Sequence, residues 1–66
     1  MKTIEQQATV ERIIRLDGTT SSISSEEAYL NMREVITDSI SEWVIPYSNK
    51  TELVWKNNYW MERRRN

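Results

Sequence analysis

The clearest hydrophobic pattern in the sequence lies between residues 25 and 43 and predicts an amphipathic helix. Apolar residues recur there at spacings of three and four, which place their side chains on one face of an α-helix. These residues are Tyr29, Met32, Ile36, Ile40 and Trp43. Ser24 precedes the run and Glu27 follows three residues later, which is the pattern of a capping box. Because Pro46 cannot continue a helix, we expect the helix to cover residues 25–44.

Alternating apolar and polar positions predict a strand over residues 8–17. One side of this strand is apolar apart from a single arginine, and it carries Val10, Arg12, Ile14 and Leu16. The density of β-branched residues favours a strand over the alternative of a short helix. Asp17 and Gly18 then mark a turn, and we interpret residues 19–25 as a polar loop.

The C-terminal part of the sequence predicts a β-hairpin over residues 52–63. Its two strands surround Asn57 and Asn58, and asparagine tolerates the positive φ angles of a type I′ turn. This register places Trp55 opposite Trp60, Val54 opposite Met61, and Glu52 opposite Arg63. A C-terminal helix that begins at Thr51 is the alternative. The face of the hairpin that carries the two tryptophans is the one we expect to pack on the helix.

These elements define a single α+β domain over residues 1–66, in the order β-α-β-β. One amphipathic helix would pack on a small antiparallel sheet, between an N-terminal segment at 1–7 and a basic tail at 64–66. The expected core consists of Val10, Ile14, Leu16, Ala28, Met32, Val35, Ile36, Ile40 and Trp43, with hairpin residues. One helix covers one face of a sheet, which would leave Ile13 and the second face exposed. We therefore expect a homo-oligomer, with a dimer favoured.

Composition removes several classes of chemistry. The 66 residues contain no cysteine and no histidine, so there is neither a thiolate ligand nor the commonest general base. No apolar run approaches the length of about 18 residues that a membrane-spanning helix needs. Residues 1–7 lack the apolar core of a signal peptide. We expect a cytoplasmic protein that is not an enzyme and has no cofactor, no metal site and no membrane contact.

The net charge of −1 hides an uneven distribution. Residues 1–48 carry four basic and eight acidic side chains, a net charge of −4, whereas residues 49–66 carry five basic and two acidic ones, a net charge of +3. Five of the six aromatic residues lie between Trp43 and Trp60, and three of them belong to the basic part. Trp, Tyr and Arg are enriched at binding hot spots. The candidate binding residues are therefore Trp55, Lys56, Tyr59, Trp60, Arg63, Arg64 and Arg65.

Two kinds of partner fit this aromatic and basic segment. A very small protein with these features is similar to the modulators that phages and other mobile elements encode, and this similarity implies that the hairpin binds and occludes a host protein. The alternative is a nucleic acid, whose bases would stack on Trp and Tyr while Arg and Lys contact phosphates.

The order of the expected elements also resembles that of dodecin, a small flavin-storage protein that assembles into a hollow shell. The resemblance covers the first strand, the helix that begins after Ser24, and Trp43 at its end. It implies an oligomeric shell in which Trp43 stacks on a flavin. The sequence departs from that family at Pro46, which interrupts the second strand, and in the shorter hairpin.

Overall fold

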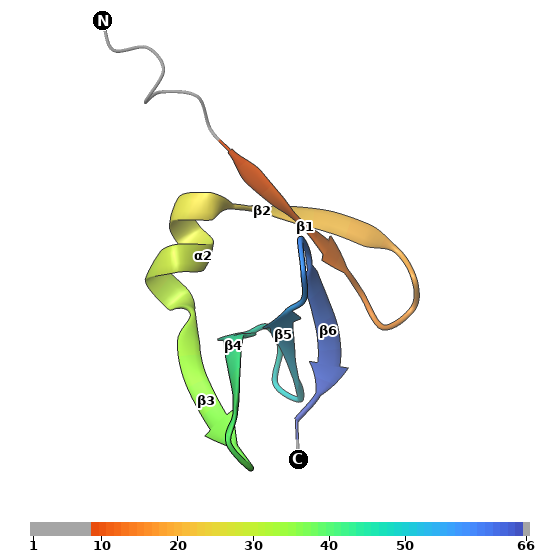
Figure 1. The fold of residues 1–66 in the computed structure, drawn as a ribbon. Coiled ribbons are helices and arrows are strands. Elements are labelled where there is room, and N and C mark those ends of the chain that lie inside the picture. Colours follow the sequence, from red (N-terminus) through yellow and green to blue (C-terminus); the bar gives the residue numbers. More distant parts are fainter. Residues whose placement is uncertain (1–8, 66) are drawn as a thin grey trace, which may run out of the picture.

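The chain folds into one six-stranded sheet and one short helix. A computed structural model describes residues 9–65 (Figure 1). The strands are β1 (Val10–Ile14), β2 (Thr20–Ser24), β3 (Arg33–Thr37), β4 (Ile40–Pro46), β5 (Thr51–Trp55) and β6 (Trp60–Arg64), and the helix is α2 (Ser25–Asn31). Their order in the sheet is β2-β1-β6-β5-β4-β3. The protein is therefore mostly β, and the expected α+β fold of order β-α-β-β is wrong.

Helix α2 begins where the sequence predicts and ends much earlier. The Glu27 amide donates a hydrogen bond of 3.1 Å to the Ser24 hydroxyl, so Ser24 is the N-cap. At the other end, Met32 adopts an extended backbone with φ −77° and ψ 153°. Its amide still donates to the Ala28 carbonyl, at 2.9 Å. The helix predicted over 25–44 is thus limited to seven residues, and the rest of that segment forms two strands.

Strands β3 and β4 form a hairpin with a two-residue turn at Asp38 and Ser39. Both residues have positive φ angles, of 51° and 67°, as the central residues of a type I′ turn do. Thr37 pairs with Ile40 on either side of it. The flanking segments are rich in β-branched residues, which pack well on a pleated sheet. This preference and the turn together outweigh the helical spacing of the apolar residues.

Replacing Asp38–Ser39 with Asn–Gly should raise the free energy of unfolding by about 1 kcal/mol, because Asn–Gly adopts a type I′ turn with less strain. Urea denaturation followed by circular dichroism measures this change. Asn58→Gly is the matched control. Among residues 9–65, Asp38 and Ser39 are the only non-glycine residues with positive φ, so the turn of the second hairpin gains nothing from glycine. A D38N/S39G variant that is no more stable than the wild type would contradict the turn assignment.

The N-terminal strand pairs with a strand that the sequence does not predict. Residues 20–24 were expected in a polar loop, but they form β2, an edge strand antiparallel to β1. The expected turn is present: Gly18 has a φ of +89°. The Asp17 carboxylate accepts hydrogen bonds from the hydroxyl and the amide of Thr19, at 2.6 and 3.0 Å. These bonds lower the pKa of Asp17 below its ordinary value.

The two parts of the sheet meet at a short parallel pairing between β1 and β6. This pairing consists of Ile13 opposite Trp60 and Ile14 opposite Met61, whereas every other described pair of strands is antiparallel. Figure 1 shows β1 and β2 crossing β6 at a steep angle. The β5–β6 hairpin has the predicted register, with Trp55 opposite Trp60 and Glu52 opposite Arg63.

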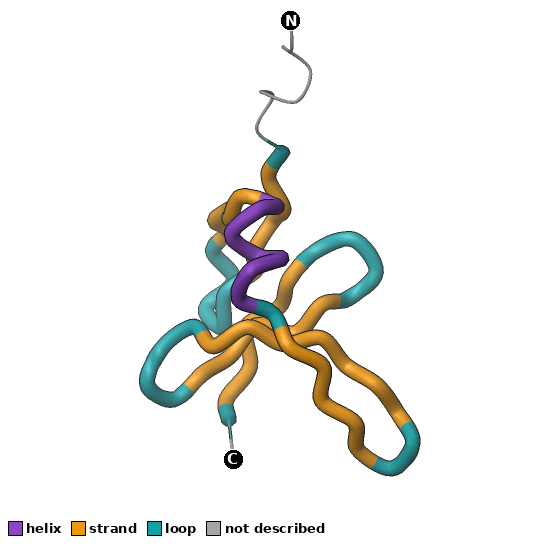
Figure 2. Tube along the Cα trace, turned by 90° about the vertical axis from the view of Figure 1, so that its left-hand side faces the viewer, coloured by secondary structure: helices purple, strands orange, loops and turns teal. Residues whose placement is uncertain are grey.

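The hydrophobic core lies between α2 and one face of the sheet, and it differs from the expected one. Figure 2 shows α2 in front of the strands. The main cluster of buried residues consists of Ile13, Ala28, Ile45, Leu53 and Trp60. Of the expected core residues only Ala28 is buried; Ile14, Met32 and Val35 are half-buried, and Val10, Leu16, Ile36, Ile40 and Trp43 are exposed. The cause is that β1 turns its other face inward and that residues 33–46 are strands.

The opposite face of the sheet is less open than expected. Val44 and Val54 point to this face from the neighbouring strands β4 and β5, and each is only 2% exposed. Ile13 lies in the core, so it cannot help to form an uncovered second face. Ile40 is also on this face and is 63% exposed, whereas Ile36, 67% exposed, pairs with Ser41 and so lies on the face of Trp43.

Candidate functional site

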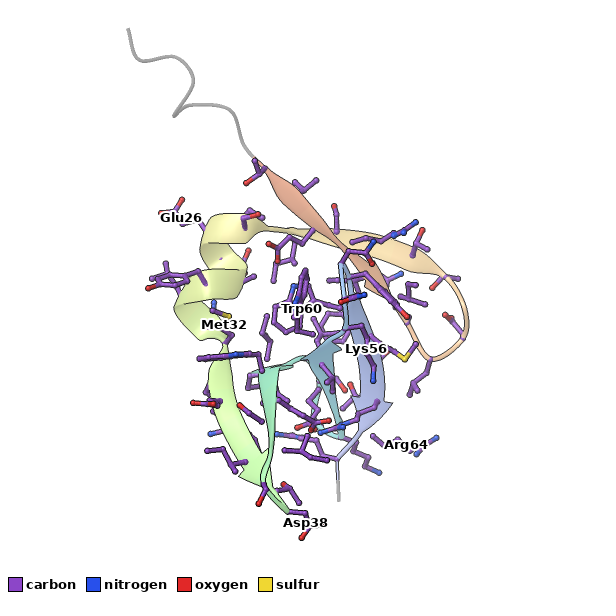
Figure 3. The ribbon with its side chains drawn as sticks, viewed as in Figure 1. Glu26, Met32, Asp38, Lys56, Trp60 and Arg64 are labelled. Carbon is purple, nitrogen blue, oxygen red and sulfur yellow. The ribbon has the colours of Figure 1, made fainter. Side chains whose placement is uncertain are left out.

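An apolar pocket lies between α2 and the sheet. It has a volume of about 430 Å³, within the range of small-ligand sites. Its lining comes from β1, α2, β4, β5 and β6, and consists of Glu11, Ser25, Ala28, Tyr29, Met32, Trp43, Trp55 and Trp60. Figure 3 shows Trp60 in the space between α2 and the sheet, with Met32 at the lower end of the helix. We call this site the aromatic pocket.

All three tryptophans of the chain line the aromatic pocket from the same face of the sheet. Trp55 and Trp60 face each other across β5 and β6, with ring centroids 5.1 Å apart and planes tilted by 59°. Trp43 reaches this face because Ile45, two residues later, pairs with Leu53, two residues before Trp55. Trp60 is buried and Trp43 is 41% exposed. Trp60 therefore forms a buried wall of the pocket, and Trp43 lies at its exposed rim.

Of the described residues that line this pocket, Glu11 alone is acidic. Its Oε1 accepts a hydrogen bond of 2.7 Å from Nε1 of Trp60, and its Oε2 accepts one of 3.2 Å from the Ser25 hydroxyl. These bonds connect β1 to β6 and to the start of α2. In the described part of the chain, no lysine or arginine forms an ion pair with Glu11. The carboxylate thus brings a negative charge to an aromatic surface.

Arg63 lies on the opposite face of the sheet and is held by two carboxylates. Its Nε donates to Glu52 at 2.9 Å, and its two terminal nitrogens donate to Glu42 at 2.8 and 3.2 Å. These bonds raise the pKa of Arg63 and lower that of Glu42. The predicted cross-strand match of Glu52 and Arg63 is confirmed. Arg63 thus connects β4, β5 and β6. The carboxylates of Glu42 and Glu52 already neutralise its charge.

The other basic residues of the tail lie near the β4–β5 loop. Arg64 is exposed and pairs through its backbone with Thr51. The Arg65 guanidinium donates to the carbonyls of Ser48 and Asn49, so it fastens the end of the chain to that loop. Lys56 lies at the other end of the hairpin, where its amide donates to the Tyr59 carbonyl at 2.8 Å.

The structure separates the seven candidate binding residues rather than bringing them together. Trp55 and Trp60 point toward α2, whereas Lys56, half-buried Tyr59 and Arg63 belong to the other face by strand alternation. The continuous surface of aromatic and basic side chains expected from the sequence is therefore absent from the described hairpin. Trp60 in particular is a wall of the pocket and is only 2% exposed.

Most of the pocket residues were missed as a site by the sequence reasoning. Tyr29, Met32 and Trp43 belong to the apolar stripe of the predicted helix, and Met32 and Trp43 were expected in the core. Glu11 gave no signal, because its partner Trp60 lies 49 residues away in the sequence. A tryptophan on each of three separate elements was the one pattern that could have indicated a shared pocket.

The same elements remove the basis of the dodecin resemblance. Trp43 lies within strand β4 and not at the end of a helix, and two strands precede α2. No protein-family model matches the sequence, and no curated protein and no solved structure shows a significant match. Within residues 9–65 there is no group of three or more potential metal ligands. The same range contains no helix that is long and apolar enough to cross a membrane.

Proposed function

We propose that this protein is a non-enzymatic binding protein and that it takes a side chain of a protein partner into the aromatic pocket. The observation that carries the proposal is the convergence of Trp43, Trp55 and Trp60 on one cavity of about 430 Å³. Pockets that are lined by aromatic side chains and open to solvent typically bind an anchoring side chain of a protein partner. Occlusion of the partner needs no catalytic group.

The size of the chain and its surplus of aromatic residues support a modulator of the kind that phages and mobile elements encode, with a host protein as the partner. The lack of cysteine in the sequence supports action in a reducing compartment such as the cytoplasm. The contact surface in this proposal is the pocket rather than the hairpin alone. Arg64 remains available to form charge contacts beside a docked partner, because it is exposed.

Peptides selected from a random display library should bind the wild-type protein and should bind Trp43→Ala at least about ten-fold more weakly. The reason is that Trp43 is the accessible indole of the pocket, 41% exposed. Fluorescence anisotropy of labelled peptides measures the dissociation constants.

Ile40→Ala is the matched control for this experiment. Ile40 also lies on β4 and is 63% exposed, but it belongs to the opposite face and does not line the pocket. Its truncation should leave peptide binding unchanged. Failure to enrich any peptide, or equal binding by Trp43→Ala, would reject the pocket as a protein-binding site.

Two other proposals draw on different surfaces. A homodimer is supported by the exposed Ile36 and Ile40 in the β3–β4 hairpin, because β3 is an edge strand with unpaired backbone groups. A nucleic-acid partner is supported by the basic surface at Lys50, Arg64 and Arg65. The aromatic residues that would stack on bases lie on another part of the molecule, so we rank this proposal lower.

A further inference from the structure

The aromatic pocket combines three features that suit a cation. Its lining includes the three tryptophans, and the face of an indole ring carries the negative side of the ring quadrupole. Among residues 9–65, its lining contains one acidic side chain, Glu11, and no basic one. In the described residues, the ion pairs of the protein involve Arg63 on the other face of the sheet. The electrostatic complement of this pocket is therefore a positive charge.

The hydrogen bonds of Glu11 narrow the kind of cation. Each carboxylate oxygen already accepts one bond, from Trp60 or from Ser25, so each has one lone pair left to accept another. A guanidinium has five N–H groups that need acceptors, and an unmodified ammonium has three and is strongly hydrated. An indole offers no lone-pair acceptor, so the three tryptophans of the lining cannot satisfy such donors. A quaternary ammonium has no N–H group and needs only the field of the carboxylate and the faces of the rings.

We infer that the pocket binds a quaternary ammonium group, presented to it as the trimethylated lysine side chain of a partner protein. Trp43 and Trp55 would contact the methyl groups beside Trp60, and Glu11 would supply the counter-charge. The half-open form of the site suits a group at the end of a long side chain, because exposed Tyr29 and Trp43 stand at its rim. This inference rests on the proposed function and specifies its ligand.

The test compares a charged probe with a neutral one of the same shape. The probes are a short peptide that carries trimethyllysine and the same peptide with a tert-butyl group in place of the trimethylammonium. Binding is followed by NMR on the tryptophan indole N–H signals. We expect the charged peptide to bind at least about ten-fold more tightly than the neutral one, and Trp43→Ala to abolish the difference.

Glu11→Gln tests the counter-charge with little change of shape. A glutamine oxygen can still accept from Trp60, so the variant should fold, which circular dichroism checks. Its affinity for the charged peptide should fall several-fold, while its affinity for the neutral peptide should not change. The control is Glu26→Gln. Glu26 lies on α2, which lines the pocket, but its side chain points away from the pocket (Figure 3).

The possible outcomes separate this inference from the proposed function. Equal binding of the two peptides would overturn the ammonium inference and leave an apolar side chain as the ligand, so the proposed function would stand. Binding of neither peptide would also overturn the inference, and the display selection would then decide the proposed function. If Glu11→Gln weakens both peptides equally, the role of its charge is refuted.

Discussion

Trp60→Ala should remove a large part of the free energy of unfolding. Trp60 is only 2% exposed and lies in the core cluster with Ile13 and Leu53. Truncation of a buried tryptophan costs about 3–5 kcal/mol, while a chain of this length has a total stability of about 3–10 kcal/mol. The substitution also removes the indole N–H that bonds to Glu11 at 2.7 Å. Urea or thermal denaturation followed by circular dichroism measures the loss.

Trp43→Ala is the control for this prediction. It removes the same side chain from the same pocket, but Trp43 is 41% exposed, so we expect a loss of about 1 kcal/mol or less. A Trp60→Ala protein as stable as Trp43→Ala would contradict the placement of Trp60 in the core. Because Trp60 supports the fold, its truncation cannot be used to measure binding.

Ile13→Ala should destabilise the protein by about 2–5 kcal/mol and should act mainly on the N-terminal hairpin. Ile13 is buried and forms one of the two parallel pairs between β1 and β6. That pairing is the only strand pairing in residues 9–65 that holds the β1–β2 hairpin to the rest of the sheet. Its weakening should allow β1 and β2 to detach before the antiparallel strands β3 to β6 open.

Hydrogen exchange measured by mass spectrometry locates this effect. Peptides from β1 and β2 should lose protection in Ile13→Ala more than peptides from β4 and β5. Val10→Ala is the control, because Val10 is on the same strand but is 63% exposed and should change stability by less than about 0.5 kcal/mol. Uniform loss of protection along the chain would show that the two parts of the sheet unfold as one unit.

Local signals in the sequence predicted several features of the fold correctly. Ser24 is the N-cap, Gly18 lies in the first turn, and the β5–β6 register follows from the match of Glu52 with Arg63. Each of these features depends on residues that are close in the sequence or opposite each other across one short loop. The type I′ turn was predicted at the wrong hairpin, however, since it occurs at Asp38 and Ser39.

The helix over 25–44 was predicted because the hydrophobic spacing was ambiguous. Met32, Ile36 and Ile40 are separated by four residues, and a separation of four keeps side chains on one face in a helix and also in a strand. Only the turn at Asp38 distinguishes the two, and Asp–Ser is a weaker turn signal than Asn–Gly. The density of β-branched residues was a better guide than the period.

The inward face of β1 could not be decided locally. Each face of the strand carries one charged residue among apolar ones, Arg12 on one side and Glu11 on the other. The face with Glu11 turns inward because Trp60 and Ser25 donate hydrogen bonds to its carboxylate. These donors belong to β6 and α2, so the pocket depends on contacts that appear only in the complete fold.

A ligand bound in the aromatic pocket would also stabilise the folded chain, because the pocket includes the hydrogen-bonded pair Glu11 and Trp60. The two residues are 49 positions apart, and the pocket between them exists only while β1 stays paired with β6. A ligand in the pocket would therefore bridge β1 and β6. It would bind the folded chain but not the chain in which β1 has detached from β6. Its presence would shift the balance of opening and closing, and protease resistance would rise with its concentration. The concentration of the partner would then determine how long each molecule resists degradation in a cell.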